Sequence, residues 1–309
     1  MMKISLLIVT KKWKPDQSTF INFEKLKVEN VSYEVLVAEG NNPSSQRNFL
    51  ASEAEGEFIL FLDDDSIPEE NLLEQYCKTL MLSPETEMIG GPSVLSEDSS
   101  FLNPLSRIFF GSSFGAGPIR SRYTSFGGVR KATERDLILC NLMFKKDFFL
   151  KTKGFSQDLY PGEENEFIKN ISGSSHILYD PLAIVHRSPR PDFLSFLMQM
   201  FSYGKGRSKH LKLLGTDEWI FLIPFFFTSY VLLLPAFFKV SLIFLIPILI
   251  HFVLSIVLNL KSIENSLKPT QVIVLPLVFF AGHFCYGFGM LFGFIKYKTP
   301  IKRIFTKNK

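Results

Sequence analysis

The sequence predicts an α/β protein in which a Rossmann-like, mostly parallel sheet comes first and an α-helical membrane segment follows. Short apolar runs alternate with helix-like segments over residues 3–62, as is typical of a doubly wound sheet. The acidic residues Asp63, Asp64 and Asp65 follow the last of these runs directly. Hydrophobic residues make up 46% of the chain and gather in its last third, which indicates membrane-spanning helices.

Three apolar runs predict neighbouring parallel strands, over residues 3–10, 33–38 and 58–62. Runs this short, bounded by turn residues, are typical of strands that are buried on both faces. Between the second and the third, Ser44 to Ala54 predicts a helix with Ser44 or Ser45 as its N-cap. Strand and helix therefore alternate as a parallel sheet requires.

Polar residues stand at the ends of these strands, namely Thr10, Glu39 and Asp63. Because ligands bind just past the carboxyl ends of parallel strands, we expect the three to face one ligand. The carboxylates from Asp63 to Asp65 repel one another unless a cation neutralises them. Mg²⁺ and Mn²⁺ prefer such oxygen ligands and hold diphosphates. The alternative is an acidic strand-to-helix turn without metal, because Pro68 begins a helix.

The next hundred residues predict further regular structure: a helix over 71–82, strands over 88–94 and 137–144, a helix over 146–151 and a strand pair over 177–185. Residues 111–135 differ, because glycine and serine are interleaved there with arginine and lysine. Such a segment predicts either a lid whose arginines bind phosphate or a disordered loop.

A second acidic run, Glu163, Glu164 and Glu166, follows Gly162 at the start of a predicted helix. Acidic side chains at this position often only complement the helix dipole. A carboxylate on a glycine turn before a helix can also point into a cleft as a general base. The residues alone leave both interpretations open.

Three apolar segments of about 20 residues predict transmembrane helices, over 219–238, 240–260 and 271–295. Residues 193–215 predict a basic amphipathic helix at the membrane surface. The expected domains are a cytosolic domain of residues 1–192, this interfacial helix, and a membrane domain of residues 216–309 with a basic tail. We therefore expect a multi-pass protein of the inner, cytoplasmic membrane.

The charges around these segments conflict with three crossings. An odd number of crossings places the basic helix and the basic tail on opposite sides, whereas the positive-inside rule places both in the cytosol. Either the rule is broken here, or one segment lies in the interface or re-enters. Prolines offer places for broken helices, at Pro224, Pro235, Pro247 and Pro276.

The overall composition excludes other classes of protein. The net charge of +4 is modest, so it does not predict a nucleic-acid partner. The cysteines Cys77, Cys140 and Cys285 are few and far apart, which predicts neither a disulfide framework nor a zinc site. No secretory signal is visible, because the apolar run at residues 4–9 is short and two lysines follow it.

Three stretches occur in a characteristic order: SSQRNFLASEAEGEFILFLDDDSIPEENLL (44–73), CNLMFKKDFFLKTKGFSQDLYPGEENEFIKNI (140–171), and the segment from His186 to YGKGRS (203–208). Together they resemble the GT-A glycosyltransferases of family 2, which transfer a sugar from a nucleotide to an acceptor with inversion. The resemblance covers most of residues 1–210, and it implies a GT-A catalytic domain.

The resemblance implies a role for individual residues. Asp65, Asp63 and His186 would hold Mn²⁺ or Mg²⁺. Glu164 would be the catalytic base, with Glu163 as the fallback. The nucleotide would be bound by Thr10, Glu39, Arg47, Asp63 and Asp64. Glu39 and Glu164 each stand where the family usually has an aspartate.

The resemblance also implies the reaction. One sugar would pass from a nucleotide-sugar, by default a UDP-sugar, to a lipid-linked or membrane-proximal glycan acceptor in cell-surface polysaccharide or glycolipid assembly. A processive synthase fits less well, because the Arg and Trp of its Gln-x-x-Arg-Trp motif are replaced in Gln199 to Tyr203. A polyprenyl-phosphate glycosyltransferase and a non-catalytic nucleotide-binding scaffold in a membrane assembly are the alternatives.

Overall fold

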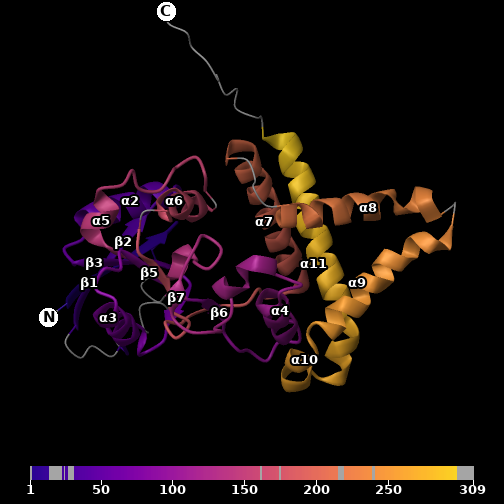
Figure 1. The fold of residues 1–309 in the computed structure, drawn as a ribbon, viewed down its shortest axis with the longest axis horizontal. Helices are drawn as coiled ribbons and strands as arrows, with labels where there is room; N and C mark the ends of the chain where they lie inside the picture. Colours follow the sequence, from indigo (N-terminus) through magenta and orange to yellow (C-terminus); the bar gives the residue numbers. More distant parts are fainter. Residues whose placement is uncertain are drawn as a thin grey trace, which may run out of the picture. The chain divides into compact units, whose positions relative to one another are not determined.

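The fold is that of a computed structural model, which describes residues 2–13, 23, 25–26, 31–160, 162–173, 175–214, 219–238 and 241–297. The chain divides into two compact units, Met1–Pro189 and Arg190–Lys309 (Figure 1). The predicted basic tail beyond residue 297 lies outside the described residues.

The first unit is built on a seven-stranded sheet with the order β2-β1-β3-β8-β5-β9-β7. Its strands are β1 (Met2–Thr10), β2 (Val31–Glu39), β3 (Phe58–Asp63), β5 (Met88–Gly90), β7 (Arg130–Lys131), β8 (Leu142–Lys145) and β9 (Ile177–Tyr179). The first three are parallel, whereas β8 runs antiparallel to both β3 and β5. The predicted α/β class with a mostly parallel sheet is confirmed, with β8 and β7 as the reversed strands.

Helices cover both faces of this sheet. They are α2 (Pro43–Glu53), α3 (Leu72–Leu82), α5 (Lys146–Leu150) and α6 (Glu163–Ile171), whereas α4 (Leu102–Gly111) packs against β6 (Ser93–Leu95) of a second, smaller sheet. Leu7 and Val9 of β1 belong to the apolar core under α2, α5 and α6. Leu6 and Ile8 belong to the second core, under α3. Side chains alternate across a strand, so the continuous apolar run of β1 fills both cores.

Asn42 is the N-cap of α2, so the prediction of Ser44 or Ser45 was wrong. The Asn42 side chain accepts a hydrogen bond from the backbone N–H of Ser45 at 3.1 Å. Asparagine is among the strongest N-cap residues, and Pro43 suits the first helical position after it. The N-cap therefore lies two or three residues earlier than predicted.

A small second sheet has the order β4-β10-β6, with β4 (Ser66–Pro68), β10 (Val185–Arg187) and β6 (Ser93–Leu95). The strand predicted over 88–94 is therefore divided between two sheets. The chain turns at Gly91, where an added Cβ would clash with the carbonyl oxygen of Ala183. Only glycine allows the backbones to approach so closely there.

Asn141 links the two sheets from a fully buried position. Its amide donates to the carbonyl oxygens of Pro92 at 3.0 Å and Ala183 at 2.7 Å. The Tyr76 hydroxyl donates to its side-chain oxygen at 2.6 Å. Buried polar groups that are satisfied in this way fix a single arrangement, which places β10 and its His186.

The glycine-rich segment 111–135 is folded, which removes the disordered alternative. It forms the 3₁₀ helix η1 (Gly117–Arg122) and strand β7. Arg130 lies over the Tyr179 ring at 4.1 Å and pairs with Asp136 at 2.8 Å. Arg122 is buried. These two arginines therefore hold the segment in place.

The second unit contains α7 (Phe193–Leu214), η3 (Trp219–Leu222), α8 (Ile223–Phe238), η4 (Leu242–Leu245), α9 (Ile246–Val257), α10 (Leu260–Ser266) and α11 (Pro269–Lys296). Trp219–Ala236 and Pro269–Lys296 are long and apolar enough to cross a membrane. The predicted middle span is broken, because Leu242–Val257 and Leu260–Ser266 meet at a bend of 57°. The break falls at Asn259 rather than at any of the prolines.

Candidate active site

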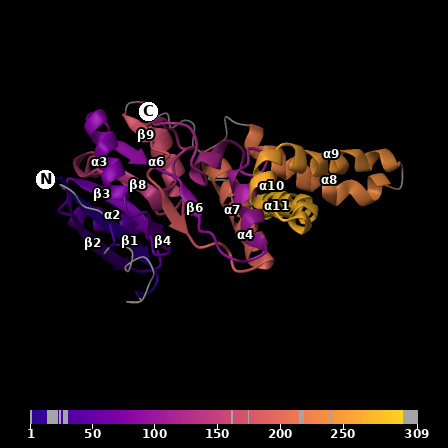
Figure 2. The ribbon, with the colours of Figure 1, turned by 90° about the horizontal axis from the view of Figure 1, so that it is seen from below.

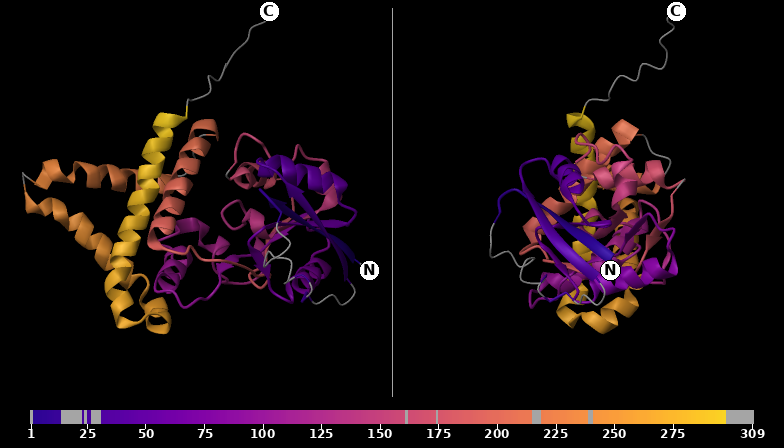
Figure 3. Two further views of the ribbon diagram at one scale, coloured as in Figure 1. Left: turned by 180° about the vertical axis from the view of Figure 1, so that it is seen from behind. Right: turned by 90° about the vertical axis from the view of Figure 1, so that its left-hand side faces the viewer.

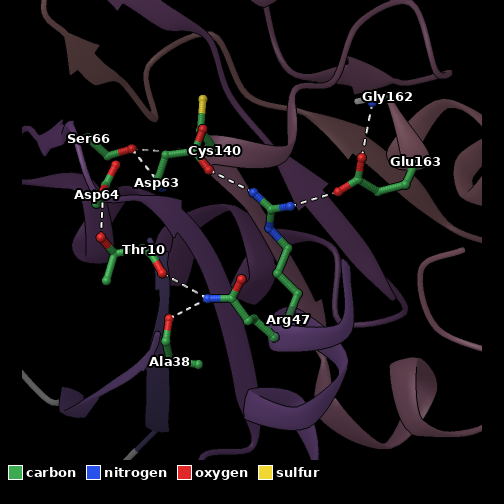
Figure 4. A network of polar contacts seen from close by, with 10 residues as sticks. Thr10, Ala38, Arg47, Asp63, Asp64, Ser66, Cys140, Gly162 and Glu163 are labelled. Atoms are coloured by element: carbon green, nitrogen blue, oxygen red, sulfur yellow. Dashed lines mark hydrogen bonds and ion pairs between the residues drawn. The ribbon is translucent and has the colours of Figure 1, made fainter. Parts of the chain in front are cut away.

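Three strand ends meet at one edge of the large sheet. Thr10 of β1 is paired in register with Glu39 of β2, and Val9 is paired with Asp63 of β3. The Thr10 hydroxyl donates to the Asp64 carboxylate at 2.7 Å (Figure 4). Glu39 accepts from the backbone N–H of Trp13 at 2.8 Å, which holds the loop after β1. The polar residues predicted to share a ligand therefore share this edge.

Three successive residues of α2 tie this edge to the rest of the unit. The Gln46 amide donates to the carbonyl oxygens of Thr10 at 3.0 Å and Ala38 at 2.6 Å, which joins the ends of β1 and β2. Asn48 exchanges two hydrogen bonds with the backbone of Phe155, each 2.9 Å long. Helix α2 is thus fixed both to the strand ends and to the loop before α6.

Arg47, which lies between Gln46 and Asn48 in α2, bridges two carboxylates from distant parts of the chain. Its Nη2 lies 2.8 Å from Asp63, and its Nη1 lies 2.7 Å from Glu163 (Figure 4). Burial opposes the charge of Arg47, but Asp63 and Glu163 outweigh burial and raise the pKa of the guanidinium. Arg47 was predicted to face the nucleotide, and the structure places it as the link between the two acidic runs.

Glu163 is almost fully buried, with a side chain that is 1% exposed. Burial raises the pKa of its carboxyl group; Arg47 opposes this shift and the neighbouring Glu164 adds to it. The preceding Gly162 has φ 103°, a left-handed conformation that side chains rarely adopt. Its backbone N–H donates to Glu163 at 3.0 Å. The glycine turn therefore determines the orientation of the Glu163 side chain.

Glu164, the predicted base, is also buried. Its carboxylate lies 3.4 Å from Nη1 of Arg122 and accepts from the Asn165 amide at 3.1 Å. Arg122 also donates to the Glu134 carbonyl and to the Asn165 side chain. Two adjacent glutamates at the start of α6 are therefore each held by a different buried arginine.

The metal ligands expected from the sequence lie on two elements. Asp65 is exposed in the turn after β3, and the Asp63 side chain at the end of β3 is 41% exposed beside Arg47. His186 of β10 lies 3.0 Å from Glu69 through its Nε2. In the described part of the chain, no three His, Cys, Asp or Glu side chains converge as metal ligands. Mn²⁺ and Mg²⁺ often bind through one or two carboxylates together with substrate phosphates, so these aspartates fit such an ion chemically.

Arg122 and Tyr160 belong to the site but were not singled out from the sequence. Tyr160 is half-exposed. Burial raises the pKa of its hydroxyl, and Asp63 and Glu163 raise it further, which places this residue beside the Arg47 network. The only sequence signal for Arg122 was its place in a segment rich in arginine. Nothing in that pattern distinguishes it from Arg120.

Comparisons with known proteins agree with this description. Residues 16–151 match the family model described as glycosyl transferase family 2. No curated protein sequence matches the chain. One similar solved structure is the mannosyltransferase PcManGT from Pyrobaculum calidifontis in complex with GDP-Man and Mn²⁺, with a TM-score of 0.53, 13% identity, and coverage of 93% of this chain and 86% of that chain.

Another solved structure, TarS residues 1–349 from S. aureus, matches with a TM-score of 0.44, 10% identity, and coverage of 94% of this chain and 92% of that chain. The family match covers Glu39 and Asp63 of the strand-end edge and Arg47, whereas Thr10 lies before it, and the mannosyltransferase shares the fold. The resemblance seen in the sequence is therefore confirmed. Within the first unit, residues 16–151 match glycosyl transferase family 2, and this unit has the GT-A fold.

Proposed function

We propose that the protein is an inverting, metal-dependent glycosyltransferase that moves one sugar from a nucleotide-sugar to a lipid-linked or membrane-proximal glycan acceptor. The observation that carries this proposal is the Arg47 bridge, which joins Asp63 of the strand-end edge to Glu163 of α6. The edge proposed to bind the donor is thereby tied to the start of α6, where the proposed base Glu164 follows Glu163 directly.

The strand ends are the proposed donor site. Thr10, Glu39 and Asp63 to Asp65 line the edge at which a nucleotide would bind, and Arg47 holds Asp63 in place. The mannosyltransferase of similar fold binds GDP-Man with Mn²⁺. A UDP-sugar remains the default of the family resemblance. Both nucleotides therefore belong in a donor panel.

Asp65 and Asp63 would hold Mn²⁺ or Mg²⁺, with His186 as a further proposed ligand. A divalent ion bound there would neutralise the negative charge that develops on the leaving diphosphate. Asp64 is already oriented by Thr10. The protein's own part is to fix these carboxylates on a rigid sheet edge before the donor binds.

Glu164 is the proposed base, with Glu163 as the fallback. The base takes the proton of the acceptor hydroxyl as that oxygen attacks the anomeric carbon. The bond to the nucleoside diphosphate breaks on the opposite face, so the configuration inverts. General-base catalysis is typically worth ~10²–10⁴ in rate.

The test is Glu164→Gln in the detergent-purified protein. Donor with Mn²⁺ should still raise the melting temperature, while turnover falls by ~10²–10⁴-fold. Glu166→Gln, in the same first turn of α6, is the matched control and should keep its turnover. A Glu164→Gln enzyme with full activity towards a hydroxyl acceptor would exclude Glu164, and the same assay on Glu163→Gln would then examine the fallback.

A second candidate is a polyprenyl-phosphate glycosyltransferase, whose acceptor phosphate needs no base. The ion pair between Glu164 and Arg122 favours it, because a carboxylate engaged by a buried arginine is less free to take a proton. Full turnover of Glu164→Gln with a polyprenyl phosphate would support this acceptor. No turnover or hydrolysis of any nucleotide-sugar by the wild type would support the scaffold alternative.

The apolar helices of the second unit would anchor this enzyme in the inner membrane, with its catalytic unit in the cytosol. Nucleotide-sugars are made in the cytosol, and the chain carries helices long enough to cross a membrane. Cell-surface polysaccharide or glycolipid assembly is the setting in which such an acceptor occurs.

A further inference from the structure

Glu163 and Glu164 stand next to each other at the start of α6, but their carboxylates are held differently. Nη1 of Arg47 lies 2.7 Å from Oε1 of Glu163, and the Gly162 backbone N–H donates to Oε2 at 3.0 Å (Figure 4). Both oxygens of Glu163 are therefore occupied, and only 1% of its side chain is exposed. This arrangement leaves neither oxygen of Glu163 for the proton of an acceptor.

Glu164 is held through one oxygen only. Nη1 of Arg122 lies 3.4 Å from its Oε1, and the Asn165 amide donates to the same Oε1 at 3.1 Å. Among the described residues no group donates to Oε2 of Glu164, and this oxygen is not one of the buried polar atoms that lack a partner. It therefore remains in contact with solvent, in a side chain that is 9% exposed. Oε2 is thus the oxygen through which Glu164 can take a proton.

Further contacts fix the direction of the Arg122 guanidinium. Its Nη2 donates to the Glu134 carbonyl and to the Asn165 side-chain oxygen. Asn165 thus contacts both members of the ion pair, because its amide nitrogen donates to Glu164 while its oxygen accepts from Arg122. The Arg122 side chain is 7% exposed. A planar guanidinium that is engaged on one side in this way presents its remaining donor in a fixed direction, here towards Glu164.

Strand β9 places both of the elements that carry this clamp. Tyr179 of β9 belongs to the same apolar core as Phe167 of α6, and Figure 2 shows α6 beside β9. The Tyr179 hydroxyl donates to the carbonyl of Ser121, the residue before Arg122, at 3.0 Å. Figures 1 and 3 show α6 on the same face of the large sheet as α2. The position of Arg122 relative to Glu164 is therefore fixed by the sheet before any substrate binds.

We propose that Arg122 and Asn165 are positioning residues, which hold Oε1 of Glu164 and thereby direct Oε2 towards the acceptor oxygen. The acceptor hydroxyl gives its proton to Oε2 while its oxygen bonds to the anomeric carbon, and the electrons of the broken bond leave on the diphosphate. Oε1 keeps its contacts with Arg122 and Asn165 throughout. The ion pair with Arg122 is therefore compatible with a role of Glu164 as base, and this inference rests on the proposed function.

The test uses water as the acceptor, because hydrolysis of the donor requires no knowledge of the natural acceptor. A water molecule then attacks the anomeric carbon and gives its proton to Oε2. GDP-Man and a panel of UDP-sugars are offered with Mn²⁺ to the detergent-purified full chain, and kcat and KM are measured for the donors that the wild type hydrolyses.

Arg122→Gln should lower kcat by ~10²-fold, the loss that a misplacement of about 1 Å can cause, with an unchanged KM for the donor. Asn165→Ala keeps the buried ion pair, so it provides a second variant if Arg122→Gln does not fold. It should lower kcat by at least about tenfold, which corresponds to one hydrogen bond to a charged group. Both variants should keep the rise in melting temperature that donor and Mn²⁺ cause.

The double variant Arg122→Gln with Glu164→Gln distinguishes positioning from a general loss of structure. If Arg122 acts through Glu164, the double variant should have the kcat of Glu164→Gln alone, within about twofold. Arg120→Gln is the matched control, because it removes the same charge from the same 3₁₀ helix. Its guanidinium lies over the Phe126 ring at 4.4 Å, so this variant should keep the wild-type kcat.

The outcomes separate this inference from the proposed function. If Glu164→Gln loses hydrolysis while Arg122→Gln and Asn165→Ala keep the wild-type kcat, the positioning role is overturned and the proposed base remains. Losses that multiply in the double variant would have the same meaning. Full hydrolysis by Glu164→Gln would remove the base and this inference with it, and a wild type that hydrolyses no donor would contradict the proposed function itself.

Discussion

Arg47 holds the two acidic runs together through its ion pairs with Asp63 and Glu163. Its side chain is 6% exposed, and its two carboxylate partners come from β3 and α6. Asp63 and Glu163 would repel each other without it. The sequence predicted Arg47 as a site residue but not its partners, because the bond to Glu163 joins residues that are 116 positions apart. Local patterns carry no information about such a pairing.

Arg47→Ala should destabilise the first unit by about 3–5 kcal/mol, because it leaves Glu163 buried without its cation. The matched control is Arg107→Ala, whose ion pair with Glu97 is solvent-exposed and should contribute about 0–1 kcal/mol. Differential scanning fluorimetry of the detergent-purified proteins compares the two. Equal losses of melting temperature would contradict a structural role for the Arg47 bridge.

Glu163 should give stability a distinctive pH dependence. Burial raises the pKa of its carboxyl group above the ordinary 4.5. The stabilisation gained by the protonated form is thus fully present below pH 4.5 and is lost as pH rises through the raised pKa. The Glu163→Gln side chain does not ionise, so the variant does not lose this stabilisation as pH rises. Its melting temperature relative to wild type should therefore increase between about pH 4 and pH 7. A constant or shrinking difference would contradict the raised pKa.

At the scale of elements, the prediction succeeded where the pattern is local. The strands β1, β2 and β3 and the helices α2 and α3 follow from apolar runs and helical periodicity, and the structure has them all. The division of residues 88–94 between two sheets and the reversal of β8 were not predicted. Both depend on pairing between strands that are distant in sequence, which a single run of residues does not encode.

The start of α6 is the element on which catalysis should depend most. Gly162→Ala forces a side chain into a left-handed turn, which costs about 1–2 kcal/mol and displaces Glu163 and Glu164. We expect a fall in kcat that is larger than this loss of stability alone would cause. Gly173→Ala is the control, because an added Cβ there has no heavy atom within 4 Å among those described. Equal kcat in both variants would show that the turn does not position the glutamates.

At the scale of the whole molecule, the chain joins a unit with a polar sheet edge to a unit whose apolar helices are long enough to cross a membrane and whose helix α7 has a strongly basic end. Lys205, Arg207, Lys209 and Lys212 lie in the last half of α7. Lysines near an anionic surface each contribute about 1 kcal/mol of attraction. Because the proposed donor site lies in the first unit, we expect charge in α7 to act on the encounter with the acceptor and not on the donor.

The double variant Lys205→Gln with Lys209→Gln separates these roles. In wild type, kcat/KM for a vesicle-embedded acceptor should rise with the fraction of anionic lipid, and the variant should lose most of that rise. A deficit of about 2 kcal/mol corresponds to a ~30-fold loss at high anionic lipid. Hydrolysis of the donor without acceptor should be unchanged. The charge-matched control is Lys78→Gln with Lys131→Gln in the first unit, which should keep the wild-type dependence on anionic lipid. An equal loss in both double variants would mean that net charge alone, and not the basic end of α7, attracts the enzyme to its acceptor.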